Sequence, residues 1–217
     1  RDHGVEPLVL PDLDEVARQT NARFAEGRLR ALVGAGGDGT AAELVNRTVP
    51  GVPLTLLPSG GENLLARYLG LRRAPEAICQ VIRTGGLRRY DAAAASGRIF
   101  LLMISCGFDA EVVRRVHERR RGQITKLAWA RPLWESVWGY RYPRIEVLRE
   151  GASGTANGVE GPAEIAAMEV EPWEVGWLFG FNLPCYGAGF RIAPEADGRD
   201  GLLDLCCFKG RRLRSAL

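Results

Sequence analysis

Hydrophobic and polar residues follow different patterns in the two parts of the chain. In the first part, short apolar runs alternate with segments in which apolar residues recur every three or four positions. The runs are typical of buried strands and the segments of amphipathic helices. Strands that alternate with helices indicate a parallel sheet in a three-layer α/β arrangement. The predicted strands of this part are Val5–Pro11, Leu29–Val33 and Val52–Leu57.

Capping residues mark the ends of the helices predicted in this part. Asp12 or Asp14 suits the start of the first helix, and Gly27 suits its end. Pro75 suits the first turn of the last helix, because its fixed φ is already helical. The four predicted helices run from about residue 13 to 26, 41 to 47, 64 to 69 and 75 to 84, and Gly70 and Gly85 end the last two.

The second part of the chain is richer in strand patterns. Gly- and Pro-rich turns such as Glu150–Gly158 separate them, and two helical segments interrupt the run near 109–121 and 125–139. A β-rich second domain, a sandwich, is therefore expected. The boundary falls near Gly86 to Tyr90, so the predicted domains are 1–88 and 89–217. The predicted strands are Arg88–Ala95, Arg98–Ile104, Pro143–Arg149, Ala163–Val170, Trp173–Asn182 and Leu202–Phe208.

Composition narrows the function classes. The 217 residues are 46% hydrophobic and carry a net charge of only +3, so no nucleic-acid partner is predicted. Five cysteines without C-x-x-C spacing and two distant histidines build no zinc site, and reduced thiols of a cytoplasmic protein are expected. The longest strongly apolar stretch, Ile99–Ile104, is too short to span a bilayer. No signal peptide is recognised, and a chain that begins with Arg1 is interpreted as a fragment.

A glycine loop follows the second predicted strand. Gly34, Gly36 and Gly39 satisfy the dinucleotide pattern G-x-G-x-x-G, and a strand–glycine–helix unit directs backbone N–H groups at an anion. However, the next strand ends Leu57-Pro58-Ser59, without the acid that would hold a ribose. Asp38 would repel a bare pyrophosphate but suits Mg²⁺ bound to a nucleoside triphosphate. A dinucleotide site is therefore disfavoured, and no G-K-[ST] of a P-loop occurs.

A second glycine loop, Leu57–Asn63, follows the next strand. Neighbouring parallel strands would bring the two loops side by side at the carboxyl edge of the sheet. Tight strand–helix turns would explain either loop alone, and Thr40–Glu43 would then be a simple capping box. Two facing glycine loops are harder to explain as turns, and they favour a phosphate site.

These motifs resemble those of the diacylglycerol kinase catalytic domain family, which includes sphingosine kinases and bacterial lipid kinases and is distantly similar to NAD kinases. Gly36–Asn46 resembles its nucleotide-binding motif and Leu57–Gly70 its second motif. Further segments follow in the family's order, namely Arg88–Ala95, Ser105–Val113 and Phe181–Leu205.

The resemblance implies transfer of the γ-phosphoryl group of ATP to a lipid hydroxyl, with Mg²⁺. It implies that Asp38 acts near the metal and phosphates, as the catalytic residue within this chain, and that Asp200 belongs to a metal site, with an ordinary Asp-Gly turn as the alternative. It assigns the phosphate cradle to Gly36, Gly37, Gly39 and Thr40, the support of that loop to Glu43, and the opposite wall to Gly60, Gly61 and Asn63.

The chain departs from the family pattern in two ways. Gly61 stands where the family usually has threonine, so one phosphate-facing hydroxyl is missing. The resemblance also places a first strand before Arg1 and the segment with the catalytic base beyond Leu217. A degenerate nucleotide- or lipid-binding module and a kinase of the NAD-kinase type are the alternatives.

An aromatic helix, Lys126–Pro143, bears on the lipid partner. Its Trp and Leu residues fall near one helical face and arginines stand nearby, as at a membrane surface. Packing of this face on the second domain is the favoured interpretation, and peripheral membrane association is the alternative. Nothing in the pattern predicts an oligomeric state.

Overall fold

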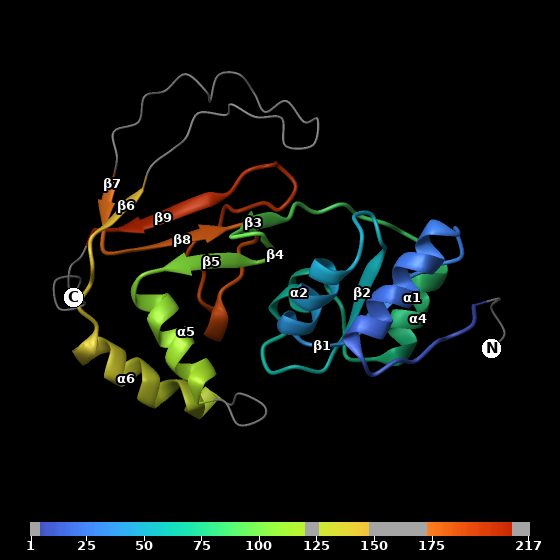
Figure 1. Ribbon diagram of the computed structural model, residues 1–217, viewed down its shortest axis with the longest axis horizontal. Helices are drawn as coiled ribbons and strands as arrows, with labels where there is room; N and C mark the ends of the chain where they lie inside the picture. The colour runs from blue at the N-terminus through green and yellow to red at the C-terminus, as the bar shows by residue number, and fades with distance from the viewer. Residues whose placement is uncertain (1–4, 120–125, 148–172, 210–217) are drawn as a thin grey trace, which may run out of the picture. The chain divides into compact units, whose positions relative to one another are not determined.

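The computed structural model describes residues 5–119, 126–147 and 173–209 (Figure 1). The chain divides into two compact units, each assembled from separate stretches. The first unit comprises residues 1–104, 121–125 and 180–206, and the second comprises 105–120, 126–179 and 207–217. These units interleave along the chain, whereas the predicted domains 1–88 and 89–217 are consecutive and stay a prediction.

The first helix of unit 1 confirms the predicted capping. Helix α1 spans Leu13–Ala25, and the carboxylate of Asp12 accepts the N–H of Glu15 at 2.8 Å. Gly27 follows the helix with φ +66°, a conformation that costs glycine little. The predicted strand Val5–Pro11 is wrong, because residues 5–11 form no strand and Val9 is 88% exposed. Pro7 and Pro11 lack the N–H that a ladder needs.

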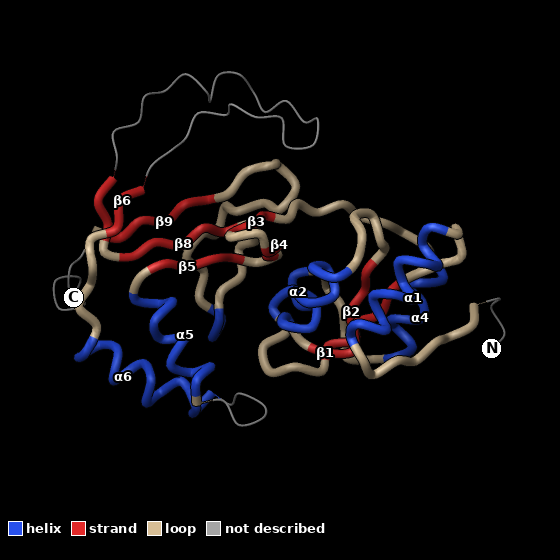
Figure 2. Tube along the Cα trace, viewed as in Figure 1, coloured by secondary structure: helices blue, strands red, loops and turns tan. Residues whose placement is uncertain are grey.

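Two parallel strands form the centre of unit 1 (Figure 2). Strand β1 spans Leu32–Gly36 and pairs in register with β2, Leu54–Pro58. Helix α2, Asp38–Arg47, begins directly after β1 and packs on it. A Cβ at Gly34 would lie 2.8 Å from Leu44 and 3.0 Å from Leu56, so this glycine lets α2 approach the strands. The first glycine of the apparent dinucleotide pattern therefore has a packing role.

Two further helices follow β2. Helix α3 spans Leu64–Tyr68, and α4 spans Pro75–Thr84 with its proline in the first turn, as predicted. The Arg30 guanidinium donates two hydrogen bonds, at 2.8 Å and 3.0 Å, to the carbonyl of Ile82, which satisfies an orphan carbonyl at the end of α4. Gly85 then ends the helix with φ +67°.

A segment from late in the chain completes the core of unit 1. Leu183 is 2% exposed and packs with a cluster from the first seventy residues, Ala41, Leu56, Leu65 and Ala66. The Asn182 amide donates to the carbonyls of Asp91 and Leu101 at 2.9 Å and 2.8 Å. The short hairpin of β3, Ala93–Ala95, and β4, Arg98–Phe100, joins α2 through Asn46, whose amide exchanges hydrogen bonds with the backbone of Ile99.

A three-stranded sheet is assembled from separate stretches of the chain. Its order is β5 (Met103–Cys106), β8 (Trp177–Phe181) and β9 (Asp204–Phe208). Strands β6, Ile145–Val147, and β7, Trp173–Val175, form a separate antiparallel hairpin. A short 3-10 turn, η3, spans Gly187–Gly189. The mixed α/β character is confirmed, but the predicted sandwich is not, and its strand Ala163–Val170 lies outside the described residues.

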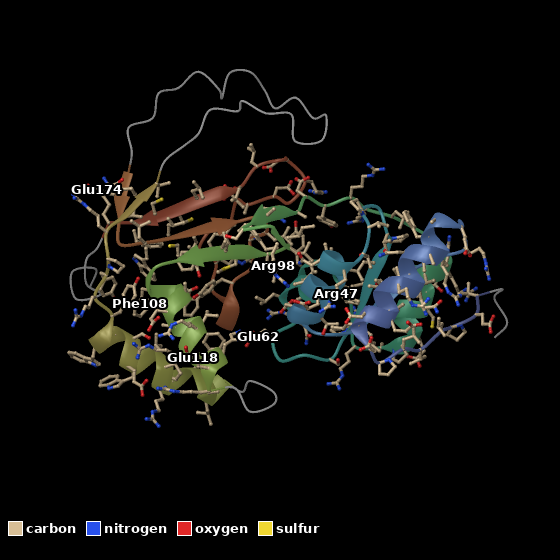
Figure 3. All side chains as sticks on the ribbon, in the orientation of Figure 1. Arg47, Glu62, Arg98, Phe108, Glu118 and Glu174 are labelled. Carbon is tan, nitrogen blue, oxygen red and sulfur yellow. The ribbon has the colours of Figure 1, made fainter. Side chains whose placement is uncertain are left out.

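Unit 2 packs two helices beside an aromatic cluster. Helix α5 spans Phe108–Glu118, and a 3-10 turn η1, Lys126–Trp129, leads into α6, Ala130–Gly139. The ring of Phe108, labelled in Figure 3, stacks on Tyr142 at 5.7 Å and meets Trp177 edge-on at 5.4 Å. No helix among the described residues is both long and apolar enough to cross a membrane.

The aromatic face of α6 does not pack inward, so the favoured sequence interpretation is wrong. The buried residues of this helix are Pro132 and Ser136, and Ser136 is fully buried. Trp134 and Trp138 remain 66% and 57% exposed. Helical periodicity defines a face but not the direction in which it points, and here the small side chains allow close approach to α5.

Glu111 makes unit 2 sensitive to acid. Its carboxylate accepts hydrogen bonds from Arg114 at 2.8 Å and Arg115 at 2.7 Å. The bond from Arg114, aided by Arg115, lowers the Glu111 pKa from 4.5 to about 2. The stability that this shift contributes is complete above pH 4.5 and is lost as the pH falls toward 2. We expect urea titrations to show that the Glu111→Gln variant is less stable than wild type at neutral pH. The difference in the free energy of unfolding should shrink as the pH falls from 4.5 toward 2. A difference that does not change with pH would contradict this role of Glu111.

Candidate nucleotide site

The two glycine loops of unit 1 lie against each other. A Cβ at Gly60 would fall 2.7 Å from the Cα of Gly37, and one at Gly37 would fall 3.2 Å from the Cα of Gly60. The N–H of Ser59 donates to the carbonyl of Gly36 at 3.0 Å. The loops that follow β1 and β2 therefore touch through their backbones, as the parallel pairing of these strands leads one to expect.

Asp38 joins the two loops. It is the first residue of α2, and its carboxylate oxygens accept the N–H groups of Leu64 at 3.0 Å and Leu65 at 2.9 Å. These donors belong to the first turn of α3, which lacks helical acceptors of its own. Charge-assisted bonds of this kind are about twice as strong as neutral ones. Asp38 therefore fixes the second loop relative to the first.

Asn63 closes the second loop on itself. Its side-chain oxygen accepts the N–H of Gly60 at 2.9 Å, and its amide donates to the Gly60 carbonyl at 2.7 Å. Asn63 also has φ +50°, in the left-handed region that asparagine tolerates better than most residues. Asn63 thus shapes the turn that presents Gly60 to Gly37, while Gly61 is exposed on the same loop.

The first turn of α2 is open to an anion. The N–H groups of Asp38, Gly39 and Thr40 belong to this turn, and no side chain caps it at Gly37. A Cβ at Gly36 would lie 2.1 Å from the Thr40 hydroxyl oxygen, so that glycine makes room for the hydroxyl. A Cβ at Gly39 would meet nothing within 4 Å. Gly39 is therefore not required by packing, and the space beside it suits a phosphate group.

Glu43 contacts arginines. It forms ion pairs with Arg47 on α2 and Arg98 on β4, both labelled in Figure 3, and these arginines lower its pKa, Arg47 first. The alternative of a Thr40–Glu43 capping box is wrong, because α2 begins at Asp38 and its N-cap is Gly37. Glu43 instead ties α2 to the β3–β4 hairpin, and its support of the glycine loop stays a prediction.

Asp200 lies in a turn near the end of unit 1. Its carboxylate accepts the N–H of Leu202 at 2.9 Å, and Asp91 accepts the N–H of Gly201 at 2.8 Å. Among the described residues, no three His, Cys, Asp or Glu side chains gather as a metal-binding group. Mg²⁺ commonly takes one or two carboxylates and completes its shell with phosphate oxygens and water. The residues present therefore fit Mg²⁺ only as a partner of bound phosphates.

Three residues near this site escaped the sequence prediction. Burial raises the pKa of the Cys185 thiol, and the charge of Asp38 raises it further, while Arg67 and Arg191 oppose them. The Asp38 carboxylate and two cationic side chains thus act on one thiol in unit 1. Arg67 follows the second loop, within the motif Leu57–Gly70, and Cys185 and Arg191 lie in the segment 181–205. The resemblance of these two motifs to the family is the sequence feature that could have pointed to the three residues.

Comparison with known proteins agrees with the motifs. Residues 7–95 match the family model described as the diacylglycerol kinase catalytic domain. A protein of Pseudomonas aeruginosa named "Probable lipid kinase YegS-like" is 33% identical over 179 residues, 80% of this chain and 53% of that protein. A diacylglycerol kinase of Bacillus subtilis is 26% identical over 189 residues, 84% of this chain and 56% of that protein. The chain thus spans about half the length of these curated relatives.

A solved structure extends the comparison to the fold. A diacylglycerol kinase from Bacillus anthracis superposes with a TM-score of 0.61 at 19% identity, covering 93% of this chain and 61% of that one. At this identity the likeness concerns the fold alone. The recognised resemblance is confirmed, and with it a mixed α/β fold of the kind found in these kinases.

Proposed function

We propose that this chain, whose residues 7–95 match the family model of the diacylglycerol kinase catalytic domain, is part of an ATP-dependent lipid kinase. The reaction is transfer of the γ-phosphoryl group to a lipid hydroxyl, of the diacylglycerol or sphingoid type. The match to this family model and the similarity to proteins named as lipid kinases support the reaction class. The substrate and the turnover are our proposal.

The observation that carries the proposal is the uncapped first turn of α2 beside the second loop. Its N–H groups and the positive end of the helix dipole suit the phosphates of ATP. Asp38 holds Gly60 and Asn63 as the opposite wall, through its bonds to the start of α3. Phosphoryl transfer depends mainly on such positioning and on charge neutralisation.

Positive charge for the phosphates would come from Arg67 and Arg191. Arg67 lies on α3, whose first turn donates to Asp38, and Arg191 opposes, with Arg67, the rise that burial and Asp38 cause in the Cys185 pKa. Mg²⁺, when bound with ATP, would neutralise phosphate charge, with Asp38 or Asp200 as its carboxylate partner. Each carboxylate oxygen has more than one lone pair, so Asp38 can keep its backbone bonds and accept a further contact.

The lipid acceptor defines the partner and the place of action. We expect the protein to act in the cytoplasm and to meet its lipid at a membrane surface. Two alternatives follow from the sequence. The missing threonine at Gly61 favours a non-catalytic nucleotide- or lipid-binding module, and the first motif alone would suit a kinase of the NAD-kinase type.

Gly39→Ala tests the phosphate site directly. Since the new methyl meets nothing within 4 Å, the fold should tolerate it, and alanine favours the helix by up to about 1 kcal/mol. The same methyl would occupy the space for a phosphate, so Mg-ATP affinity should fall at least about tenfold, or about 1.4 kcal/mol. Calorimetric titration and thermal unfolding measure the two effects.

Gly86→Ala is the matched control, since its methyl also meets nothing within 4 Å and the residue lies outside both loops. It should change neither stability nor ATP affinity appreciably. If Gly39→Ala binds ATP as tightly as wild type does, the phosphate does not bind at this turn. If wild type binds no ATP, the proposal is refuted. Phosphoryl transfer from labelled ATP can be measured with the full-length protein and with diacylglycerol, sphingosine or NAD as the acceptor. Transfer to NAD would favour a kinase of the NAD-kinase type, and transfer to none of the three would favour the non-catalytic module.

A further inference from the structure

Helix α6 of unit 2 buries small residues and exposes large apolar ones, the opposite of the usual amphipathic arrangement. Its buried positions carry Pro132 and the fully buried Ser136, both small or polar in character. Val137 packs on the Phe108 cluster. The larger side chains of Leu133, Trp134 and Trp138 are instead 46%, 66% and 57% exposed. A helix that only had to pack in water would place these residues the other way round.

Exposed apolar side chains recur along η1 and α6. Trp134 and Trp138 are one helical turn apart, and their ring centroids lie 5.7 Å apart. Large exposed apolar patches on soluble domains mark interaction sites. We call these residues the tryptophan face, and its members are Leu127, Trp129, Leu133, Trp134 and Trp138.

The charges around the tryptophan face are mainly positive. Residues 127–141 contain two basic residues, Arg131 and Arg141, and one acidic residue, Glu135. Glu135 is already paired with Arg119 and Arg131, and the Arg131 side chain is 81% exposed. Arg115 of α5 also reaches Glu135, at 3.6 Å. The negative charge is therefore neutralised locally, and the surface presents cations beside tryptophans.

Tryptophan and arginine side by side match the interface of an anionic bilayer. Indole rings favour the headgroup region, and arginines bind anionic headgroups. An amphipathic helix of this kind lies in the plane of the interface. We propose that the tryptophan face of α6 docks the protein on an anionic lipid bilayer. The inference rests on the proposed function in that a lipid kinase must reach a substrate held in a membrane.

Vesicle binding tests the surface without ATP. The chain should float with vesicles of phosphatidylglycerol and phosphatidylcholine, and less with phosphatidylcholine alone. The W134A/W138A double variant should bind at least about tenfold more weakly, because two interfacial anchors are lost. R131Q/R141Q should reduce binding to anionic vesicles most strongly at low salt. Unchanged binding of W134A/W138A would overturn the proposal.

Leu87→Ala is the matched control, since Leu87 is 76% exposed in unit 1, outside the tryptophan face. It should bind vesicles like wild type, and circular dichroism should show W134A/W138A folded. A second copy of the chain is the competing occupant. Absence of vesicle binding, with a dimer in sedimentation that W134A/W138A dissociates, would assign the face to self-association.

The outcome is separable from that of the proposed function. Gly39→Ala should bind vesicles like wild type while it loses ATP. Vesicle binding that depends on Trp134 and Trp138, in a chain that binds no ATP, would sustain the docking surface and refute the kinase proposal. If the chain binds ATP but its vesicle binding does not depend on these tryptophans, the kinase proposal stands and the docking surface is refuted.

Discussion

Replacing Asp38 by alanine is expected to abolish measurable ATP binding and to lower the free energy of unfolding by about 3 kcal/mol. The carboxylate accepts two backbone N–H groups, from Leu64 and Leu65, and both would lose their partner in a partly buried position. A hydrogen bond to a charged group contributes about 1.5–3 kcal/mol, and neighbouring bonds are not fully additive. The loops would separate, and the wall opposite the first turn of α2 would be lost.

Asp38→Asn separates geometry from charge. The amide keeps one acceptor oxygen, so about half of the stability loss should be recovered. ATP binding that depends on the negative charge of Asp38, beside phosphates and metal, should not be recovered. Asp14→Ala is the control, since Asp14 is an exposed acid of unit 1 paired with Arg47. Urea unfolding and calorimetric ATP titration of the three variants decide the matter. Wild-type stability of Asp38→Ala would show that the bonds to α3 contribute nothing.

Replacing Gly60 by alanine is expected to have the second largest effect. The added Cβ would lie 2.7 Å from the Cα of Gly37 and 2.9 Å from the Asn63 side-chain oxygen. Backbone cannot move aside as a flexible side chain can, so overpacking should destabilise the protein by about 1–3 kcal/mol. ATP affinity should fall together with stability, because the two loops can no longer touch.

The contrast with Gly39→Ala makes this result interpretable. Both variants add one methyl group to a glycine loop, but only the one at Gly60 meets backbone. Gly60→Ala should lower the midpoint of thermal unfolding by several degrees, whereas Gly39→Ala should leave it unchanged or raise it. Equal midpoints for the two variants would contradict the close approach of the loops.

The elements around the site were predictable from local pattern. The capping by Asp12, the proline start of α4 and the helix ends at Gly70 and Gly85 all depend on neighbours in sequence. The predicted end of β1 and the predicted start of α2 were less accurate. The glycines from Gly34 onward were interpreted as loop, yet β1 continues to Gly36 because these residues pair with β2 up to Pro58. Helix α2 therefore starts at Asp38 rather than near Ala41.

Tertiary contacts account for what the pattern could not predict. Asp38 was interpreted as a residue near metal and phosphates, but its bonds to Leu64 and Leu65 join residues 26 and 27 positions apart. Nothing in its local sequence distinguishes that contact. The direction of the tryptophan face depends likewise on which side of α6 meets α5. The packing of Cys185 against the core cluster that contains Ala41 and Leu65 joins distant parts of the chain and has no local signal.

The division of unit 1 along the chain has a consequence for its synthesis. Its core requires Leu183, and its hydrogen bonds to Asp91 and Leu101 require Asn182. A ribosome adds about 5–20 residues per second, so roughly eighty residues of delay correspond to about 4–16 s. During this interval the nascent strands and loops that will form the nucleotide site lack part of their core. We expect chaperones to bind this intermediate, and codon changes that slow translation between residues 105 and 180 to lower the yield of folded protein.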